Sequence, residues 1–389
     1  MPSWKLTYEA NLIALEILKG DGSSLKRNIS PPTPAQAGYR MPGEWEPHQA
    51  TWIAWPHNRD DWPGKFQSIP WIYADIVRHL AHGEQVRIVV NDAAHQRSAE
   101  RVLRNAHVAF DNVEFFRWKT DRVWTRDSGP IFVTRAEKPQ VAITHWQFNG
   151  WSKYPNHKKD ERLPGLIAEK FGFHSWQPEM AVNGKSRRVV LEGGSIDVNG
   201  RGTMLTTEEC LLSKIQQRNP GLSRDQLETF FAQYLGIKKT VWLGNGIAGD
   251  DTHGHVDDIS RFVSPNTVLT AVEKNSSDPN HAPLQENLNQ LKSATDQDGK
   301  RLNVIELPLP SPVWFRGQRL PASYANFYIA NAVVLVPTFN DANDRVALSI
   351  LKDCFPDREV VGIYCGDFIW GLGAIHCATQ QQPAAMSRG

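Results

Sequence analysis

The chain has 389 residues, and its 43 lysine and arginine residues nearly balance its 42 aspartate and glutamate residues, which leaves a formal net charge of +1. Such a balance provides no basic surface for nucleic acid or for an anionic membrane, so we expect a small-molecule partner. No segment approaches the ~20 consecutive apolar residues that cross a bilayer, and the N-terminal residues lack the apolar run of a signal peptide.

Cysteine usage indicates a reducing compartment. The four cysteines, Cys210, Cys354, Cys365 and Cys377, are far apart in the sequence and form no C-x-x-C pair. A chain of this length can bury a core without disulfide bonds, so reduced thiols and a cytoplasmic location are predicted. The sequence leaves the oligomeric state open, a homo-oligomer included.

Three segments are predicted along the chain. Residues 1–38 end in a proline-rich stretch and form a peripheral extension, in which residues 12–18 predict a short helix. Residues 39–383 are predicted to form one catalytic domain, because no low-complexity segment interrupts them. Residues 384–389 are predicted to form a frayed tail.

Strand-like and helix-like segments alternate from residue 41 onward, which predicts an α/β fold. A short apolar strand between Pro47 and Pro56 comes first. The further predicted strands are residues 85–90, 113–117, 131–134, 140–144, 189–191, 203–205, 240–243, 259–263, 268–271, 333–337 and 360–363. The predicted helices are residues 69–82, 93–106, 163–171, 224–235, 283–295 and 344–354. Strands outnumber helices, and no repeat of residue identity is visible.

Two polar motifs occur in the first half of the chain. Arg126 and Asp127 end a strand-like approach before a Gly-Pro turn. In extended backbone they face opposite ways, so Asp127 can enter a cleft while Arg126 packs behind it; an exposed turn is the competing interpretation. Glu192 stands at a strand end before Gly193 and Gly194, where a plain hairpin turn is nearly as good an interpretation.

A denser polar cluster occupies residues 249–258. With extended spacing, His255 and Asp257 project from one face while Val256 turns into the core, which suits proton transfer beside a cation. A solvated turn and a metal site are the alternatives. No H-x-x-x-H or H-E-x-x-H spacing supports a metal site, so none is predicted.

Cys377 follows the glycine-rich approach Gly371-Leu-Gly373. Glycines of this kind let a ligand come close to the backbone. If residues 374–380 are extended, His376 points away from the face that carries Cys377 and is a poor partner for the thiol. A cysteine in a strand is more often a small core residue than a nucleophile, and we interpret the other three cysteines in that way.

Taken together and in order, a series of motifs between residues 41 and 383 closely resembles the agmatine deiminase and bacterial peptidylarginine deiminase family of guanidino-modifying enzymes. The motifs are Met41-Pro-Gly-Glu-Trp-Glu-Pro-His48, Trp52-Ile-Ala-Trp-Pro56, Trp124-Thr-Arg-Asp127, Leu191-Glu-Gly-Gly-Ser195, Leu205-Thr-Thr-Glu-Glu-Cys-Leu-Leu212, Gly254-His-Val-Asp257, Ala322-Ser-Tyr-Ala-Asn-Phe-Tyr-Ile-Ala-Asn331 and Ile375-His-Cys-Ala-Thr-Gln-Gln-Gln-Pro383. So many long motifs in one order are very hard to reach by chance.

The resemblance implies a single five-bladed α/β propeller, the pentein fold, with five ββαβ units around a pseudo-fivefold axis and the active site in a central channel. It implies hydrolysis of agmatine to N-carbamoylputrescine and ammonia, with no metal or organic cofactor. Cys377 resembles the nucleophile, His255 the general acid/base, and Asp127 and Asp257 the carboxylates that hold the guanidinium.

Further contacts to this small guanidinium substrate are predicted around those four residues. Glu192 either bonds the guanidinium or the reacting water, or fixes the turn at Gly194. For the amino tail the candidates are Asp61 and Trp55, because a carboxylate and an indole face both favour an ammonium group. Asp60, beside Asp61, is a further carboxylate candidate. Trp124 completes the predicted substrate-binding set.

Some positions depart from the family pattern, and they bear on the substrate. Leu372 and Ala374 replace a glycine and an asparagine before the cysteine, and His253 stands where an acidic or amide residue is usual. Free arginine and a peptide with a C-terminal arginine are therefore alternative substrates, with Arg59, Arg122 and Arg316 as candidate partners for a carboxylate. A metal-dependent hydrolase around His253, His255 and Asp257 is the alternative from another class.

Overall fold

The structure, a computed structural model, describes residues 32–182 and 184–385, and strands and helices alternate through them. The chain divides into a unit Met1–Pro32 and a unit Thr33–Gly389, and the α/β fold belongs to the second. The helix predicted at residues 12–18 lies outside the described residues. Among the residues described, no helix has the length and apolar character to cross a membrane.

Five sheets in the described residues repeat one strand order. In each, a first strand runs antiparallel to a second strand, and a helical connection leads from the second strand to a third strand parallel to it. From first strand to third, the sheets are β20 (Gln380–Pro383), β1 (His48–Ala54) and β2 (Gln85–Val90); β4 (Ile131–Thr134), β5 (Val141–Thr144) and β6 (Ser175–Trp176); β9 (Asp197–Val198), β10 (Thr203–Thr207) and β11 (Lys239–Leu243); β12 (Ser260–Ser264), β13 (Thr267–Val272) and β14 (Asn303–Pro308); and β17 (Tyr328–Ile329), β18 (Val333–Thr338) and β19 (Glu359–Tyr364).

Three short additions accompany these sheets. Strand β3 (Val113–Arg117) extends the first sheet beside β2. The hairpins β7 (Glu179–Val182) with β8 (Lys185–Arg188) and β15 (Trp314–Phe315) with β16 (Gln318–Arg319) stand apart from the five sheets.

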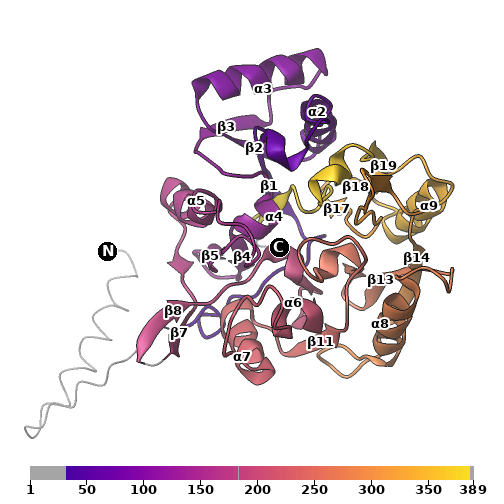
Figure 1. Cartoon of the computed structure of the whole chain (residues 1–389). Helices are drawn as coiled ribbons and strands as arrows, with labels where there is room; N and C mark the ends of the chain where they lie inside the picture. The colour runs from indigo at the N-terminus through magenta and orange to yellow at the C-terminus, as the bar shows by residue number, and fades with distance from the viewer. Residues whose placement is uncertain (1–31, 183, 386–389) are drawn as a thin grey trace, which may run out of the picture. The chain divides into compact units, whose positions relative to one another are not determined.

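Helices connect the second and third strands, and Figure 1 shows them beside their sheets. They are α2 (Ile69–Leu80), followed by α3 (Ala93–Asn105) between β2 and β3, then α5 (Leu163–Phe171), α6 (Glu208–Leu212), α7 (Arg224–Leu235), α8 (His281–Ser293) and α9 (Asp344–Cys354). Local sequence fixes the ends of α7: Ser223 and Gln226 form a capping box, and Gly236 ends the helix in the left-handed conformation.

The C-terminal strand joins the first sheet, which brings the end of the described chain beside β1. Strand β20 pairs with β1 so that Gln380 lies opposite Trp52, and the indole of Trp52 donates to Gln382. Since Cys377 precedes β20 by three residues, this pairing places the cysteine beside the segments that carry the other polar motifs.

Most predicted elements are confirmed within two residues at each end, and the strands at residues 85–90, 113–117 and 131–134 match fully. The strand predicted at residues 189–191 is wrong, because only an isolated bridge pairs Val190 with Gln147. The extended conformation considered for residues 374–380 is also wrong: residues 375–378 form a turn. Strand β14 was not predicted, because its sequence gives only a weak alternation.

Candidate active site

Five residues of the candidate site, one from the segment before each sheet, share one position in the repeated fold. Each lies within four residues before the first strand of a different sheet. They are Asp127 in α4 (Thr125–Ser128) before β4, Gly194 in the turn η3 (Gly193–Ser195) before β9, Asp257 in the turn η4 (Val256–Asp258) before β12, Asn326 before β17, and Cys377 before β20. The fold thereby brings together segments that are up to 250 residues apart.

Cys377 is almost fully buried, with 5% of its surface exposed, and it faces polar groups. Its Sγ lies 3.1 Å from Nδ2 of Asn326 and 3.8 Å from Oδ2 of Asp257. Burial, and then the charges of Asp257, Asp258 and Asp127, raise the pKa of the Cys377 thiol well above its ordinary value. Burial and the nearby carboxylates therefore favour the thiol over the thiolate at this position.

Asp127 is held by two donors. Its Oδ2 accepts from the indole of Trp151 at 2.9 Å, and its Oδ1 accepts from the backbone N–H of Gly194 at 3.0 Å. Burial raises the pKa of Asp127 to about 6, although the neighbouring His255 acts in the opposite direction. The residue lies in a helical turn rather than the extended backbone considered from sequence, yet its side chain still faces the site while Arg126 packs behind it.

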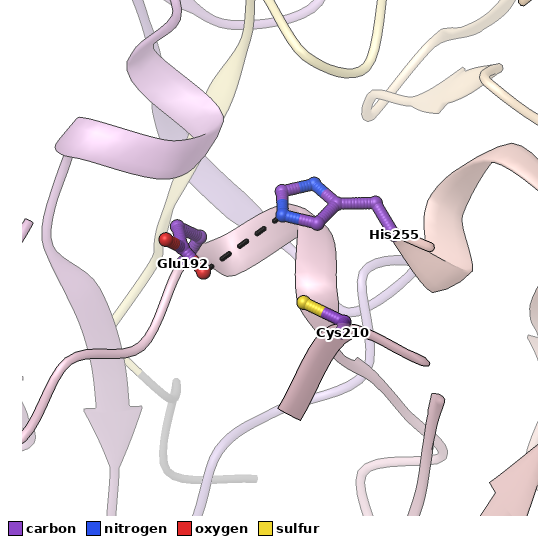
Figure 2. Close-up of side chains that lie close together, drawn as sticks. All are labelled: Glu192, Cys210 and His255. Carbon is purple, nitrogen blue, oxygen red and sulfur yellow. Dashed lines mark ion pairs between the residues drawn. The ribbon is translucent and has the colours of Figure 1, made fainter. Parts of the chain in front are cut away.

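His255 is fully buried among carboxylates. Its Nδ1 lies 3.8 Å from Asp127 and 3.9 Å from Asp257, and its Nε2 lies 3.8 Å from Glu192. Figure 2 shows Glu192 on one side of the imidazole, with Cys210 nearby. Burial lowers the pKa of His255, but Asp127 and the groups around it outweigh that effect and raise the pKa well above its ordinary value. The site therefore holds an imidazolium that can donate a proton.

Glu192 and Gly194 both stand in the segment before β9. Oε1 of Glu192 accepts from Nε of Arg218 at 3.1 Å, and both side chains are fully buried. Burial alone would raise the pKa of Glu192, but Arg218 and His255 hold it at about 2. A Cβ at Gly194 would lie 2.6 Å from Nδ1 of His255 and 2.8 Å from Oδ1 of Asp127, so only glycine leaves room for these groups.

His376 and Glu44 support the site from behind. Nδ1 of His376 lies 2.6 Å from Oδ2 of Asp257, and its Nε2 lies 2.8 Å from Oε2 of Glu44. Only an imidazolium can donate to both carboxylates. Glu44 also pairs with Arg126 and Arg261. His376 is therefore no partner for the thiol, as predicted, but it fixes the position of Asp257. Burial acts to raise the pKa of Asp257, but the hydrogen bond and charge of His376 outweigh it and lower that pKa below its ordinary value.

A cavity of about 220 Å³ opens above these groups and includes Asp127 and Cys377 in its wall. We call the buried set Asp127, Glu192, His255, Asp257 and Cys377 the floor. The outer wall, which we call the mouth, is formed by Asp60, Asp61, Arg122, Asp251, Gln318 and Trp370. In the mouth Arg122 pairs with Asp61, and Lys153 pairs with Asp251.

Some of the predicted substrate-binding residues line this cavity and one does not. Trp124 and Asp61 line it, and a Cβ at Gly373 would lie 2.8 Å from the Trp124 ring and 3.1 Å from Cβ of Cys377. Trp55 is not among the lining residues. It is buried and packs edge-on against Tyr73, where it stabilises the core.

The side chains that could hold a metal form two close clusters in the described residues: Glu192 with Cys210 and His255, and Asp257 with Asp258 and Cys377. His253, which belongs to the alternative metal site considered from sequence, is in neither. Its ring nitrogens lie near Ser213 and Glu209 instead. The ligand set of His253, His255 and Asp257 is therefore not assembled.

Sequence reasoning missed three residues that organise the floor. Asn326 donates to Cys377 and Asp258, Trp151 donates to Asp127, and Glu44 anchors His376. Asn326 and Glu44 stand inside the motifs at residues 322–331 and 41–48, but nothing in a motif tells which polar side chain turns inward. Trp151 lies outside all of the motifs.

Comparison with known proteins agrees with this geometry. The model of the Porphyromonas-type peptidyl-arginine deiminase family matches residues 40–383. A curated protein of Latilactobacillus sakei subsp. sakei (strain 23K), named as an agmatine deiminase, is 36% identical over 376 residues, which cover 90% of this chain and 98% of that protein.

Two solved structures share the fold. The agmatine deiminase of Enterococcus faecalis superposes with a TM-score of 0.83 at 31% identity, covering 92% of this chain and 99% of that one. An agmatine deiminase of C. jejuni with a cysteine replaced by serine and with substrate bound gives a TM-score of 0.78 at 27% identity, covering 90% and 97%. The chain therefore belongs to the Porphyromonas-type peptidyl-arginine deiminase family, whose members are hydrolases of C–N bonds.

Proposed function

We propose that the protein hydrolyses agmatine to N-carbamoylputrescine and ammonia, with Cys377 as a covalent nucleophile. The observation that carries this proposal is the floor itself: a thiol, an imidazole and three carboxylates converge within hydrogen-bond to ion-pair distances and are almost fully buried. Two of these carboxylates, Asp127 and Asp257, lie close to the same imidazole nitrogen near the thiol, an arrangement that suits a planar cation. A guanidinium, which is planar and cationic at any ordinary pH, is such a cation.

Asp127 and Asp257 are suited to hold the two edges of that cation. Charge-assisted, often bidentate bonds from a guanidinium to two carboxylates orient its central carbon. Asp127 is fixed by Trp151 and Gly194, and Asp257 is fixed by His376, so neither must reorganise when the substrate enters. The binding geometry is therefore prepared in advance.

The substrate cation then activates the nucleophile. In the empty floor, burial and the carboxylates around Cys377 disfavour its thiolate. A bound guanidinium neutralises those charges, so the thiol releases its proton to solvent, where the departing ammonia later takes up a proton to become ammonium, and the sulfur attacks the central carbon. An S–C bond forms, and a C–N bond breaks as ammonia leaves, which gives a thiouronium on Cys377.

His255 serves both halves of the reaction. As the imidazolium indicated by its raised pKa, it protonates the departing nitrogen. The neutral imidazole then accepts a proton from a water that attacks the thiouronium, and the C–S bond breaks. Glu192, at 3.8 Å from Nε2 of His255, is positioned to orient that water or the guanidinium. In balance, one guanidinium and one water give one ureido group and one ammonium.

The mouth favours a cationic tail. Its wall contains the carboxylates of Asp60, Asp61 and Asp251 against the single guanidinium of Arg122. Lys153 pairs with Asp251, and Arg122 pairs with Asp61. One negative charge therefore remains in excess, which suits the ammonium of agmatine. Free arginine or a C-terminal peptide arginine is the second candidate substrate. The observation that favours it is Arg122 in the same wall, because its guanidinium could bind the carboxylate of such a substrate.

The repeated sheets support a finer proposal for the fold. We infer that the five sheets are the blades of a pseudo-fivefold propeller with the floor on its axis. The shared strand order and the shared position of the site residues support it, and in Figure 1 the sheets follow one another in chain order around the region of α4. We propose also that the reaction needs no cofactor and that the protein is cytoplasmic. A cytoplasmic location suits the four free cysteines.

The experiment that tests the function is ammonia release from purified protein with agmatine, free arginine and a peptide ending in arginine, each with and without a chelator. We expect release from agmatine that the chelator does not reduce. Faster release from free arginine or from the peptide than from agmatine would identify arginine, the second candidate, as the substrate. No release from any of the three, or release abolished by the chelator, would overturn it.

A further inference from the structure

Glu192, Cys210 and His255 form a compact cluster of potential metal ligands (Figure 2). One ligand atom from each side chain lies within 4.8 Å of the other two, and all three residues are buried. They come from different segments: the loop before η3, helix α6, and the loop before η4. Thr207 caps α6 by accepting from the N–H of Cys210, which fixes where the thiol lies.

Polar atoms in this cluster have unused hydrogen-bonding capacity. Oε2 of Glu192 and both ring nitrogens of His255 are buried without a hydrogen-bond partner among the described residues. Arg218 occupies the other oxygen, Oε1 of Glu192, so Oε2 stays available. A buried polar atom without a hydrogen-bond partner destabilises the folded protein, so a ligand that binds such atoms is favoured.

We propose that Glu192, Cys210 and His255 form an inhibitory binding site for one Zn²⁺ ion. A thiolate, an imidazole nitrogen and a carboxylate oxygen are the ligand types that zinc takes in proteins. Nε2 of His255 lies 3.8 Å from Oε2 of Glu192, and a tetrahedral zinc with bonds of ~2.0–2.1 Å needs a separation of ~3.3 Å. A side-chain shift of about half an ångström brings these two atoms to that separation, and the Sγ of Cys210, within 4.8 Å of both side chains' ligand atoms, is the third ligand. Binding displaces two protons, one from the thiol of Cys210 and one from the imidazolium of His255, and both leave to the buffer.

The second cluster is less suited to zinc. Asp257 already bonds His376, Asp258 already accepts from Asn326, and the same amide donates to Sγ of Cys377. A metal there would have to break three existing interactions, and the cluster offers no imidazole. The two clusters also use different cysteines, which makes them separable by experiment.

The consequence for activity rests on the proposed function. A zinc ion on His255 and Glu192 would remove the proton donor and occupy the space where the guanidinium meets Glu192. Zinc is therefore expected to compete with the substrate and to be removed by a chelator. A metal that served the reaction would instead show activity lost on chelation, so the two ideas predict opposite responses.

The test uses Co²⁺ as a spectroscopic probe of the chelator-treated full-length protein, because a cobalt–thiolate bond gives a charge-transfer absorption in the near ultraviolet. Wild type, Cys377→Ala and Cys210→Ser are titrated, and circular dichroism checks that each is folded. We expect the band in wild type and in Cys377→Ala, its loss in Cys210→Ser, and its displacement by Zn²⁺. This readout is independent of turnover, so it stands even where the proposed function fails.

A band that persists in Cys210→Ser but disappears in Cys377→Ala would place the metal at the second cluster and overturn the proposal, as would the absence of a band in all three proteins. A folded Cys210→Ala is measured beside Cys210→Ser to separate loss of the ligand from misfolding. In turnover assays, the Zn²⁺ concentration that inhibits wild type should be at least ~10-fold lower than the concentration that inhibits Cys210→Ser, provided that this variant retains activity. Equal inhibition would contradict an inhibitory role.

Discussion

The floor and the mouth of the cavity are built from similar residue types but are held in different ways. In the floor, Asp127 is fixed by an indole and a backbone N–H, and Asp257 is fixed by an imidazole that is itself anchored to Glu44. In the mouth, Asp61 and Asp251 pair with the long side chains of Arg122 and Lys153.

This difference suggests separate roles for the two regions, catalysis for the floor and substrate selection for the mouth. Asp127 and Asp257 are held in a fixed geometry by an indole, a backbone N–H and an imidazole, and they face the substrate cation. In the mouth, the partly exposed pair of Lys153 and Asp251 can exchange partners at modest cost, whereas the pair of Arg122 and Asp61 is more deeply buried. The floor therefore determines that a guanidinium reacts. The mouth determines which tail accompanies it, and changes in the two regions should affect different kinetic constants.

The largest effect is expected in the floor, on removal of the nucleophile. Cys377→Ala should lose ~10⁴-fold or more in kcat, because no other group in the cavity wall can form the thiouronium. Steady-state assays of ammonia release measure it. Cys354→Ala, on helix α9, is the matched control and should retain activity. Comparable losses in both variants would point to folding rather than chemistry.

Asp127→Asn should lower kcat/KM by ~10³-fold, because one of the two charges that orient the guanidinium is removed. It should also change stability with pH. The folded-state pKa of Asp127, about 6, lies above its ordinary value, so the wild-type protein loses stability as pH rises between about 4 and 6. The asparagine variant lacks that loss and should be more stable above this range, by up to ~3 kcal/mol.

Urea unfolding of wild type and Asp127→Asn across that range measures the difference. A gap between the two that stays constant from acid to neutral pH would contradict the burial of an ionised Asp127. A variant less stable than wild type at neutral pH would show that the bonds from Trp151 and Gly194 outweigh the cost of burial.

Gly194→Ala tests how little room the floor has. Its Cβ would displace His255 and Asp127 by several tenths of an ångström or more, and a shift of this size should lower kcat by ~10²-fold. Gly165→Ala, in helix α5, meets only a carbon of His145 at 3.6 Å and is the matched control. Full activity in Gly194→Ala would mean that His255 and Asp127 are not held as closely as the geometry indicates.

The smallest effect is expected in the mouth. Asp61→Asn leaves Arg122 without its carboxylate partner, so the cation should repel the ammonium of agmatine and raise KM by ~10-fold with little change in kcat. Asp60→Asn, an exposed neighbour that does not pair with Arg122, should change KM less. A fall in kcat without a rise in KM for Asp61→Asn would move that residue from selection to chemistry.

The floor was more predictable from sequence than the mouth, for a physical reason. Asp127, Glu192, Gly194, His255, Asp257 and Cys377 stand in short polar motifs beside strand ends, and the structure gathers all of them. The mouth depends on pairings such as Arg122 with Asp61 between residues 61 apart, which no local pattern reveals. Trp55 illustrates the limit: an indole beside two carboxylates suggested a tail contact, yet it packs in the core.

The fold shows the same limit. Strands with strong alternation or continuous apolar runs, such as β2 and β18, were predicted almost to the residue. The backbone around Asp127, Asp257 and Cys377 was not, because short turns there are stabilised by distant partners, as in the donation from the N–H of Arg126 to the carbonyl of Cys377. Those contacts arise only after the sheets assemble.

The most direct test of the central claim is mass spectrometry of the protein quenched in acid during turnover of agmatine. We predict that the peptide containing Cys377 gains the mass of agmatine less ammonia, that the gain disappears when the substrate is exhausted, and that Cys377→Ala shows none. Turnover without any such adduct, with Cys377→Ala still active, or an adduct on Cys210 instead, would contradict the account.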